Sequence, residues 1–106
     1  MKEIVFTRRF ELDFRRLKRK VARHALDYET LEYIFALLQA GKALPEAFRE
    51  HPLERDFAGF TECHLDADWL LIYRVLRHRV VLHRTGTHRD LFRSRRRGQA
   101  GAILPR

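Results

Sequence analysis

The chain has 106 residues, of which 45% are hydrophobic and 34% charged, a balance that excludes a disordered protein and fits a single globular domain. The 22 Lys and Arg against 14 Asp and Glu give a formal net charge of +8, so we expect anionic partners: nucleic acid first, or an acidic protein or anionic membrane surface. The longest apolar runs, 33–38 and 69–73, fall far short of the ~20 residues that span a bilayer, and one cysteine excludes an internal disulfide.

The first residues lack the long apolar segment of a secretory signal, so we expect a cytoplasmic protein. Residues 3–7 are β-branched and aromatic, which predicts a strand. From 8 to 24 the apolar residues recur every three or four positions and predict a helix. Its other face is basic and is either a solvated surface or a phosphate-binding one; among its cations are Arg15, Arg16, Lys18 and Arg19.

A second helix is predicted over 28–40, with Asp27 as its N-cap and Gly41 as the left-handed residue that ends it. Residues 46–58 are interpreted as a loop with at most one helical turn before His51. Three strands follow at 60–65, 69–76 and 80–85, and their short connections favour an antiparallel meander. The predicted fold is therefore α+β in the order β-α-α-β-β-β, with both helices on one face of a small antiparallel sheet.

We expect one domain over residues 1–92 and a basic, flexible C-terminal tail over 93–106, because the tail shows no sustained periodicity. Trp69 and Tyr73 are predicted to belong to the core, and Cys63 to be a small buried residue without chemistry. Strict alternation along the last strand would place Val80, Leu82 and Arg84 on one face.

Several residues with the chemistry of a nuclease stand on predicted strand ends or loops: His51, His64, Asp68, Arg84 and His88. Metal-free RNA cleavage needs a base for the 2′-hydroxyl, an acid for the leaving 5′-oxygen and cations for the transition state. Imidazoles, a carboxylate and Arg84 supply these groups, and Phe92 offers a ring that can stack on a base.

Two alternatives remain open at this point. Each imidazole taken singly is at least as well explained as a hydrogen-bonded structural residue, and the ring of Phe92 as a cap on the core. A zinc site with His51, His64, Asp68 and His88 as ligands is a further possibility, although their spacing matches no known metal motif.

The segments Glu50-His51-Pro52-Leu53, Glu62-Cys63-His64, Asp68-Trp69-Leu70-Leu71-Ile72-Tyr73 and Arg84-Thr85-Gly86-Thr87-His88 resemble the YafQ branch of the RelE/ParE toxin superfamily. The resemblance covers nearly the whole chain to Phe92. It implies a type II toxin: a ribosome-dependent endoribonuclease that cuts mRNA in the decoding site by 2′-hydroxyl attack, without metal or other cofactor.

The resemblance also implies roles for particular residues and partners. The catalytic positions fall on His51, His64, Asp68 and His88, with Arg84 as the phosphate-stabilising cation and Phe92 as an aromatic at the site. A cognate antitoxin would neutralise the toxin, and the complex would repress its own operon by binding operator DNA. Residues 57–61 depart from the family pattern by losing two cations and a hydroxyl. A non-catalytic, ParE-like toxin or binding module is the alternative.

Overall fold

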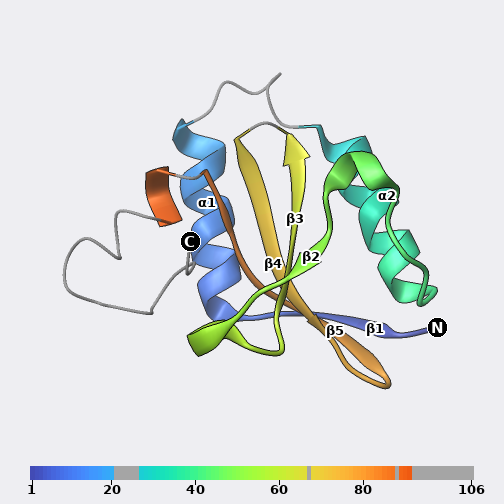
Figure 1. The fold of residues 1–106 in the computed structure, drawn as a ribbon. Helices are drawn as coiled ribbons and strands as arrows, with labels where there is room; N and C mark the ends of the chain where they lie inside the picture. The colour runs from blue at the N-terminus through green and yellow to red at the C-terminus, as the bar shows by residue number, and fades with distance from the viewer. Residues whose placement is uncertain (21–26, 67, 88, 92–106) are drawn as a thin grey trace.

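The computed structural model describes residues 1–20, 27–66, 68–87 and 89–91. Its helices are α1 (Arg8–Lys20) and α2 (Tyr28–Gln39), with two short 3₁₀ helices, η2 (Glu46–Phe48) and η3 (Arg55–Phe57). The strands are β1 (Glu3–Phe6), β2 (His51–Pro52), β3 (Thr61–Asp66), β4 (Trp69–Val75) and β5 (Arg79–Gly86) (Figure 1). The predicted α+β order is confirmed, and the two-residue strand β2 is an addition that the sequence did not predict.

The sheet has the strand order β1-β5-β4-β3-β2. The segments from β2 to β5 pair antiparallel with their neighbours, whereas β1 lies at the opposite edge and pairs parallel to β5, with Val5 beside Val81. The predicted meander of three strands is therefore correct. A parallel β1 joins the two ends of the domain, since its partner lies more than 70 residues away in sequence.

The ends of α2 follow the predicted capping chemistry. The Asp27 carboxylate accepts hydrogen bonds from the Thr30 backbone N–H, at 3.0 Å, and from the Thr30 hydroxyl, at 2.6 Å. These two bonds hold the pKa of Asp27 below its usual range. At the other end Gly41 has φ +73°, and the N–H groups of Gly41 and Lys42 donate to the carbonyls of Leu38 and Leu37. Such a left-handed cap favours glycine because it has no Cβ.

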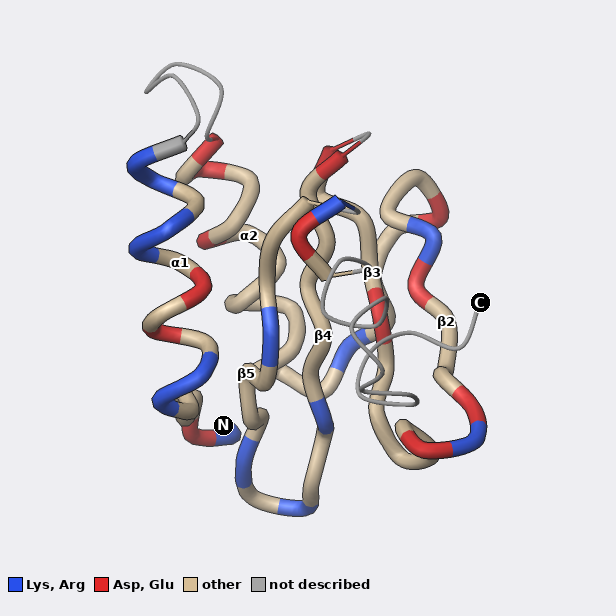
Figure 2. Tube along the Cα trace, turned by 90° about the vertical axis from the view of Figure 1, so that its left-hand side faces the viewer, with Lys and Arg blue, Asp and Glu red and all other residues tan. Residues whose placement is uncertain are grey.

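Two apolar clusters cover the two faces of the sheet. The larger cluster packs α1 and α2 against the sheet and includes Phe10, Ile34, Leu71, Trp69 and Tyr73. The smaller cluster covers the other face; it comprises Leu53, Phe57, Leu70, Ile72 and Leu91, with Phe60 packed against it. Strand β4 is thus buried on both faces, which explains its continuous apolar run. In Figure 2 α1 lies beside β5, and β2 forms the far edge of the sheet.

The predicted core residues are confirmed. Trp69 and Tyr73 are buried, and the Trp69 indole N–H donates to the Thr85 hydroxyl at 2.8 Å. Cys63 is also fully buried, and burial raises the pKa of its thiol far above the usual range. Cys63 is therefore an inert core residue. No described helix is long and apolar enough to cross a membrane.

Candidate active site

The loop between α2 and β3 is attached to the sheet by one carboxylate. Glu50 accepts a hydrogen bond from the backbone N–H of Leu44 at 3.1 Å and another from the Tyr73 hydroxyl at 2.5 Å. The pKa of Tyr73 lies far above its usual range, because the phenol is buried and donates to Glu50. Since His51 is the next residue, these two hydrogen bonds of Glu50 also fix the position of the His51 backbone.

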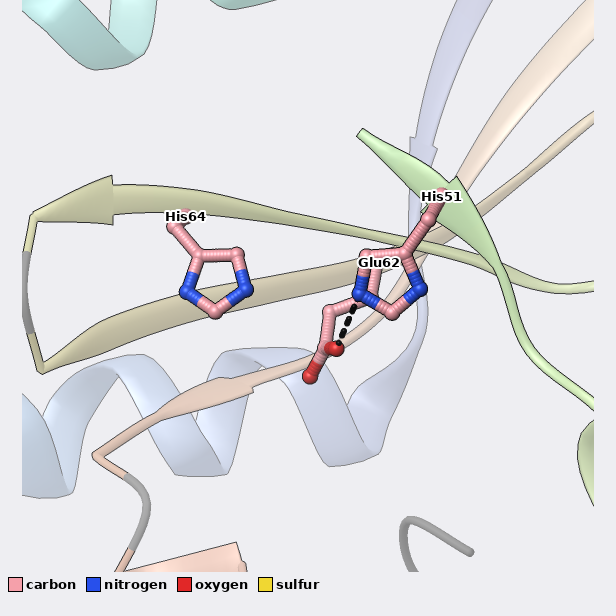
Figure 3. A group of neighbouring side chains, drawn as sticks. All are labelled: His51, Glu62 and His64. Atoms are coloured by element: carbon pink, nitrogen blue, oxygen red, sulfur yellow. Dashed lines mark ion pairs between the residues drawn. The ribbon is translucent and has the colours of Figure 1, made fainter. Parts of the chain in front are cut away.

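Strand β2 then places His51 directly opposite Glu62 of β3. Paired residues of neighbouring strands project from the same face of a sheet, and so do residues two apart along one strand. His51, Glu62 and His64 therefore share one face, while Cys63 points into the larger core cluster. The three side chains converge as Figure 3 shows, and one ligand atom of each lies within 4.8 Å of the others.

Glu62 lies at the centre of this cluster. Its side chain is 0% exposed, and one carboxylate oxygen lies 2.9 Å from Nε2 of His51, whose side chain is 41% exposed. A carboxylate oxygen accepts, so the Nε2 nitrogen of His51 carries the proton of this contact. The ring centroids of His51 and His64 are 6.1 Å apart. A buried acid thus orients one of two neighbouring, solvent-accessible imidazoles.

Arg49 contacts the second imidazole. Its Nη2 lies 3.3 Å from Nδ1 of His64, and a guanidinium can only donate. The Nδ1 nitrogen of His64 is therefore the acceptor, and the neutral ring carries its proton on Nε2. Arg49 adopts a left-handed backbone conformation, with φ 49°, at the end of η2, so the loop itself aims this cation at the cluster.

Arg84, which we predicted to stabilise a phosphate, has a different environment. Its side chain is buried and forms an ion pair with Asp13 of α1, with Nε–Oδ2 and Nη2–Oδ1 distances of 2.6 and 3.2 Å. The Thr85 backbone N–H donates to the same carboxylate. The pairing register with β4 shifts here, since Leu82 pairs with Tyr73 and Arg84 with the preceding Ile72. Val80 and Leu82 nevertheless belong to the core cluster that packs against α1, and Arg84 binds Asp13 of the same helix, so the expected shared face of these three residues is confirmed. In this structure Arg84 joins α1 to β5.

The remaining predicted site residues are placed only in part. Asp68 is exposed in the turn between β3 and β4, four positions after His64. His88, Phe92 and the predicted tail 93–106 lie outside the described residues. Of their described neighbours in sequence, Asp90 donates its backbone N–H to the Thr87 hydroxyl at 3.1 Å. Leu91 is buried in the smaller core cluster.

The predicted phosphate-binding cations of α1 lie apart from the histidines. Arg15, Arg16, Lys18 and Arg19 are exposed on α1, which packs against β5. The cluster of His51, Glu62 and His64 belongs to β2 and β3 at the far edge of the sheet. Figure 2 shows this separation, with the blue segments of α1 on one side and β2 on the other.

Two imidazoles and a carboxylate are also the donor set of many divalent-metal sites. Among the described residues, His51, Glu62 and His64 form the group that could hold such an ion. Two of the four zinc ligands predicted from the sequence, His51 and His64, therefore belong to this group, with Glu62 in addition; His88 lies outside the described residues. Sequence reasoning missed Glu62; its signal was an acid two residues before His64 in a predicted strand, hence on the same face.

Comparison with known proteins gives the family. A family model described as the bacterial toxin of type II toxin-antitoxin systems, YafQ, matches residues 2–93. The mRNA interferase toxin YafQ of Escherichia coli is 36% identical over 67 residues, which are 62% of this chain and 73% of that protein.

Solved structures agree with that match. YafQ from E. coli superimposes with a TM-score of 0.72 at 30% identity, covering 87% of this chain and 99% of that one. The E. coli DinJ-YafQ complex gives 0.73 at 29% identity, with the same coverage. A copper-bound mutant toxin from Helicobacter pylori gives 0.77 at 28% identity, covering 87% and 100%. The resemblance stated from the motifs is confirmed, and the chain belongs to the YafQ family of toxins of type II toxin-antitoxin systems.

Proposed function

We propose that this protein is an mRNA interferase: a cytoplasmic, ribosome-dependent endoribonuclease that cuts mRNA in the decoding site and so inhibits translation. The observation that carries the proposal is the convergence of His51, Glu62 and His64 on one accessible face of the sheet. A relative that is 36% identical is named an mRNA interferase toxin. A pure binding module would not need this set of proton-transfer groups.

The proposed reaction is a transesterification within the RNA. A base takes the proton of a 2′-hydroxyl, the 2′-oxygen attacks the adjacent phosphorus, and the bond from phosphorus to the 5′-oxygen breaks as an acid protonates that oxygen. The products are a 2′,3′-cyclic phosphate and a free 5′-hydroxyl. His51 and His64 exchange these protons, together with Asp68 and His88 from the predicted set.

The neighbours of the imidazoles have supporting roles. Glu62 holds the ring of His51 through its 2.9 Å contact, and Arg49 holds that of His64. Arg84 is the phosphate-stabilising cation of the predicted set, but its side chain is buried against Asp13. We therefore add Arg49, whose side chain is exposed, as a second cation for this role. Phe92 would stack on a base beside the cut.

The surface charge supports binding to the ribosome. The cations Arg15, Arg16, Lys18 and Arg19 on α1 and the formal charge of +8 favour contacts with the phosphates of ribosomal RNA. A cognate antitoxin neutralises the toxin, as DinJ forms a complex with YafQ in E. coli. Operator DNA would be reached only through that complex.

The mechanism we propose is metal-independent, although the cluster could also hold a divalent ion. The metal-bound structures of the toxin from H. pylori make this a question to settle by experiment. Cleavage that persists in EDTA, in an assay whose ribosomes are kept intact by polyamines, would support proton transfer by the side chains alone. Loss of cleavage that is restored by micromolar zinc or copper would replace that mechanism with a metal-assisted one.

The deciding experiment maps mRNA ends by primer extension after brief induction, with and without translation. His64→Gln is compared with a matched control, His78→Gln, in the exposed connection between β4 and β5. Loss of one acid-base group should lower the cleavage rate by about 10²–10⁴-fold, while the control cleaves normally. Growth arrest without new mRNA ends would instead favour a non-catalytic, ParE-like toxin.

A further inference from the structure

Three neighbouring strands bring two rings and a cation together on the face of the sheet that carries the smaller core cluster. The ring of Phe60, directly before β3, stacks on the imidazole of His83 in β5, with a centroid distance of 4.6 Å and 29° between the planes. The guanidinium carbon of Arg74, near the end of β4, lies 5.5 Å from the centroid of the Phe60 ring. We call Phe60, Arg74 and His83 the stacking cluster.

The core holds the two rings in place. Phe57 is buried and contacts both of them, with centroid distances of 5.7 Å to Phe60 and 6.0 Å to His83. The Phe60 backbone is fixed as well, because its carbonyl accepts a hydrogen bond from the Leu53 N–H at 2.8 Å. Phe60 and His83 are half-buried and Arg74 is exposed. The two rings therefore form a fixed aromatic surface that solvent reaches in part.

The stacking cluster continues a row of side chains that begins at the proposed active site. Phe60, Glu62 and His64 follow one another at intervals of two residues, so they project from the same face of the sheet. At the usual rise of a strand, Phe60 lies ~13–14 Å along the chain from His64. A few nucleotides of extended RNA span this distance. An RNA strand held at the histidines can therefore reach the rings.

The charge around the cluster favours RNA as its ligand. Residues 69–89, which include β4 and β5, contain five arginines and no acidic residue. Glu54 and Asp56 are exposed in the neighbouring loop and offset part of this charge, so we expect contacts to a base more than to phosphates. Burial lowers the pKa of His83, and Arg84 adds to the effect, so the imidazole is an uncharged aromatic ring at neutral pH.

Arg74 can change partners when RNA binds. Its contact with Phe60 is a cation–π interaction at an exposed site, which is weaker than the stacking of a base on an aromatic ring. A base can therefore replace the guanidinium on the ring of Phe60. The released guanidinium can then donate to the adjoining phosphate.

We propose that the stacking cluster is a subsite for one base of the mRNA, a few nucleotides from the cut and separate from the base assigned to Phe92. The base stacks on Phe60 beside His83, and Arg74 contacts the adjoining phosphate. Every base has a π face, so the subsite positions the strand without selecting its sequence. This inference rests on the proposed function, because it needs an mRNA strand at His64.

The test uses mRNA bound to ribosomes, with a single abasic nucleotide placed at each position around the cut in turn. The parent protein carries His64→Gln so that the mRNA stays intact, and fluorescence anisotropy measures its affinity for these ribosomes. Phe60→Leu removes the ring but keeps an apolar side chain, whereas Phe60→Tyr keeps the ring. Arg74→Gln removes the cation of the cluster, and Arg77→Gln is its control in the exposed connection between β4 and β5.

We expect one abasic position to weaken binding of the parent protein and of Phe60→Tyr by about 10-fold. The same position should weaken binding of Phe60→Leu by less than about twofold, because the ring that the base would contact is absent. Arg74→Gln should bind intact mRNA about fivefold more weakly than Arg77→Gln does. Equal affinities of these two variants would exclude Arg74 from the subsite.

Two results would overturn the proposal. One is unchanged affinity in Phe60→Leu. The other is weaker binding of Phe60→Leu in which every abasic position keeps its full effect, because the rings would then contact ribosomal RNA. Thermal unfolding checks the fold of each variant, and His83→Leu replaces Phe60→Leu if that variant proves unstable.

The same measurements separate this inference from the proposed function. A protein that does not bind these ribosomes would refute both. Cleavage of mRNA by the wild type, with every abasic effect unchanged in Phe60→Leu, would refute the subsite alone.

Discussion

The ion pair between Asp13 and Arg84 offers a test of what Arg84 does. Both side chains are nearly inaccessible, at 4% and 6% exposure, and their closest atoms are 2.6 Å apart. Asp13→Ala would leave a buried guanidinium without its carboxylate and the Thr85 N–H without its acceptor. Breaking one side of such a buried pair costs about 3–5 kcal/mol, whereas replacing both sides by apolar residues is often close to neutral.

We therefore expect Asp13→Ala to lower the free energy of unfolding by about 3–5 kcal/mol, a large part of the ~5–15 kcal/mol of a typical domain. The double variant Asp13→Leu with Arg84→Met should recover most of the loss. Urea unfolding followed by circular dichroism measures both. A loss below about 1 kcal/mol for Asp13→Ala would refute the structural role that we assign to the pair.

The same double variant separates structure from catalysis. If Arg84 only joins α1 to β5, the refolded double variant should cleave mRNA at a rate close to that of the wild type. If Arg84 also stabilises the phosphate, the rate should fall by about 10²-fold or more although the fold is restored. Arg49→Gln, measured in parallel, tests the exposed cation beside His64.

Three further outcomes follow from contacts in the fold. Glu62→Gln keeps a hydrogen-bond partner for His51 but removes the charge, so cleavage should fall by about 10²-fold with the fold intact; unchanged cleavage would exclude Glu62 as an orienting group. Trp69→Phe removes the bond to the Thr85 hydroxyl and should cost about 1–2 kcal/mol in urea unfolding, and a neutral change would show that the bond contributes nothing. Burial lowers the pKa of His83 in the folded protein, and nearby Arg84 adds to the effect. Near and below the ordinary histidine pKa of ~6.5, the unfolded state therefore binds more protons at this residue than the folded state does. The free energy of unfolding should fall as the pH drops through that value and more steeply than in His83→Phe, and parallel pH profiles would contradict this.

Local patterns in the sequence determined much of the fold and part of the candidate site. The spacing of Phe10, Phe14 and Leu17 and the caps at Asp27 and Gly41 predicted the helices, because such signals act within a few residues. Alternation and short connections predicted the meander. The motifs around His51 and His64 identified the family, and the structure brings these two imidazoles together.

Only the tertiary structure decided contacts between residues far apart in the chain. A parallel β1 beside β5, the strand β2 that sets His51 against Glu62, and the ion pair between Asp13 and Arg84 each join segments between 11 and 76 positions apart. No local period encodes them, because they depend on how whole elements pack. For the same reason the sequence could not show that packing of α1 on β5 buries the charge of Arg84, the predicted phosphate-stabilising cation, against a carboxylate.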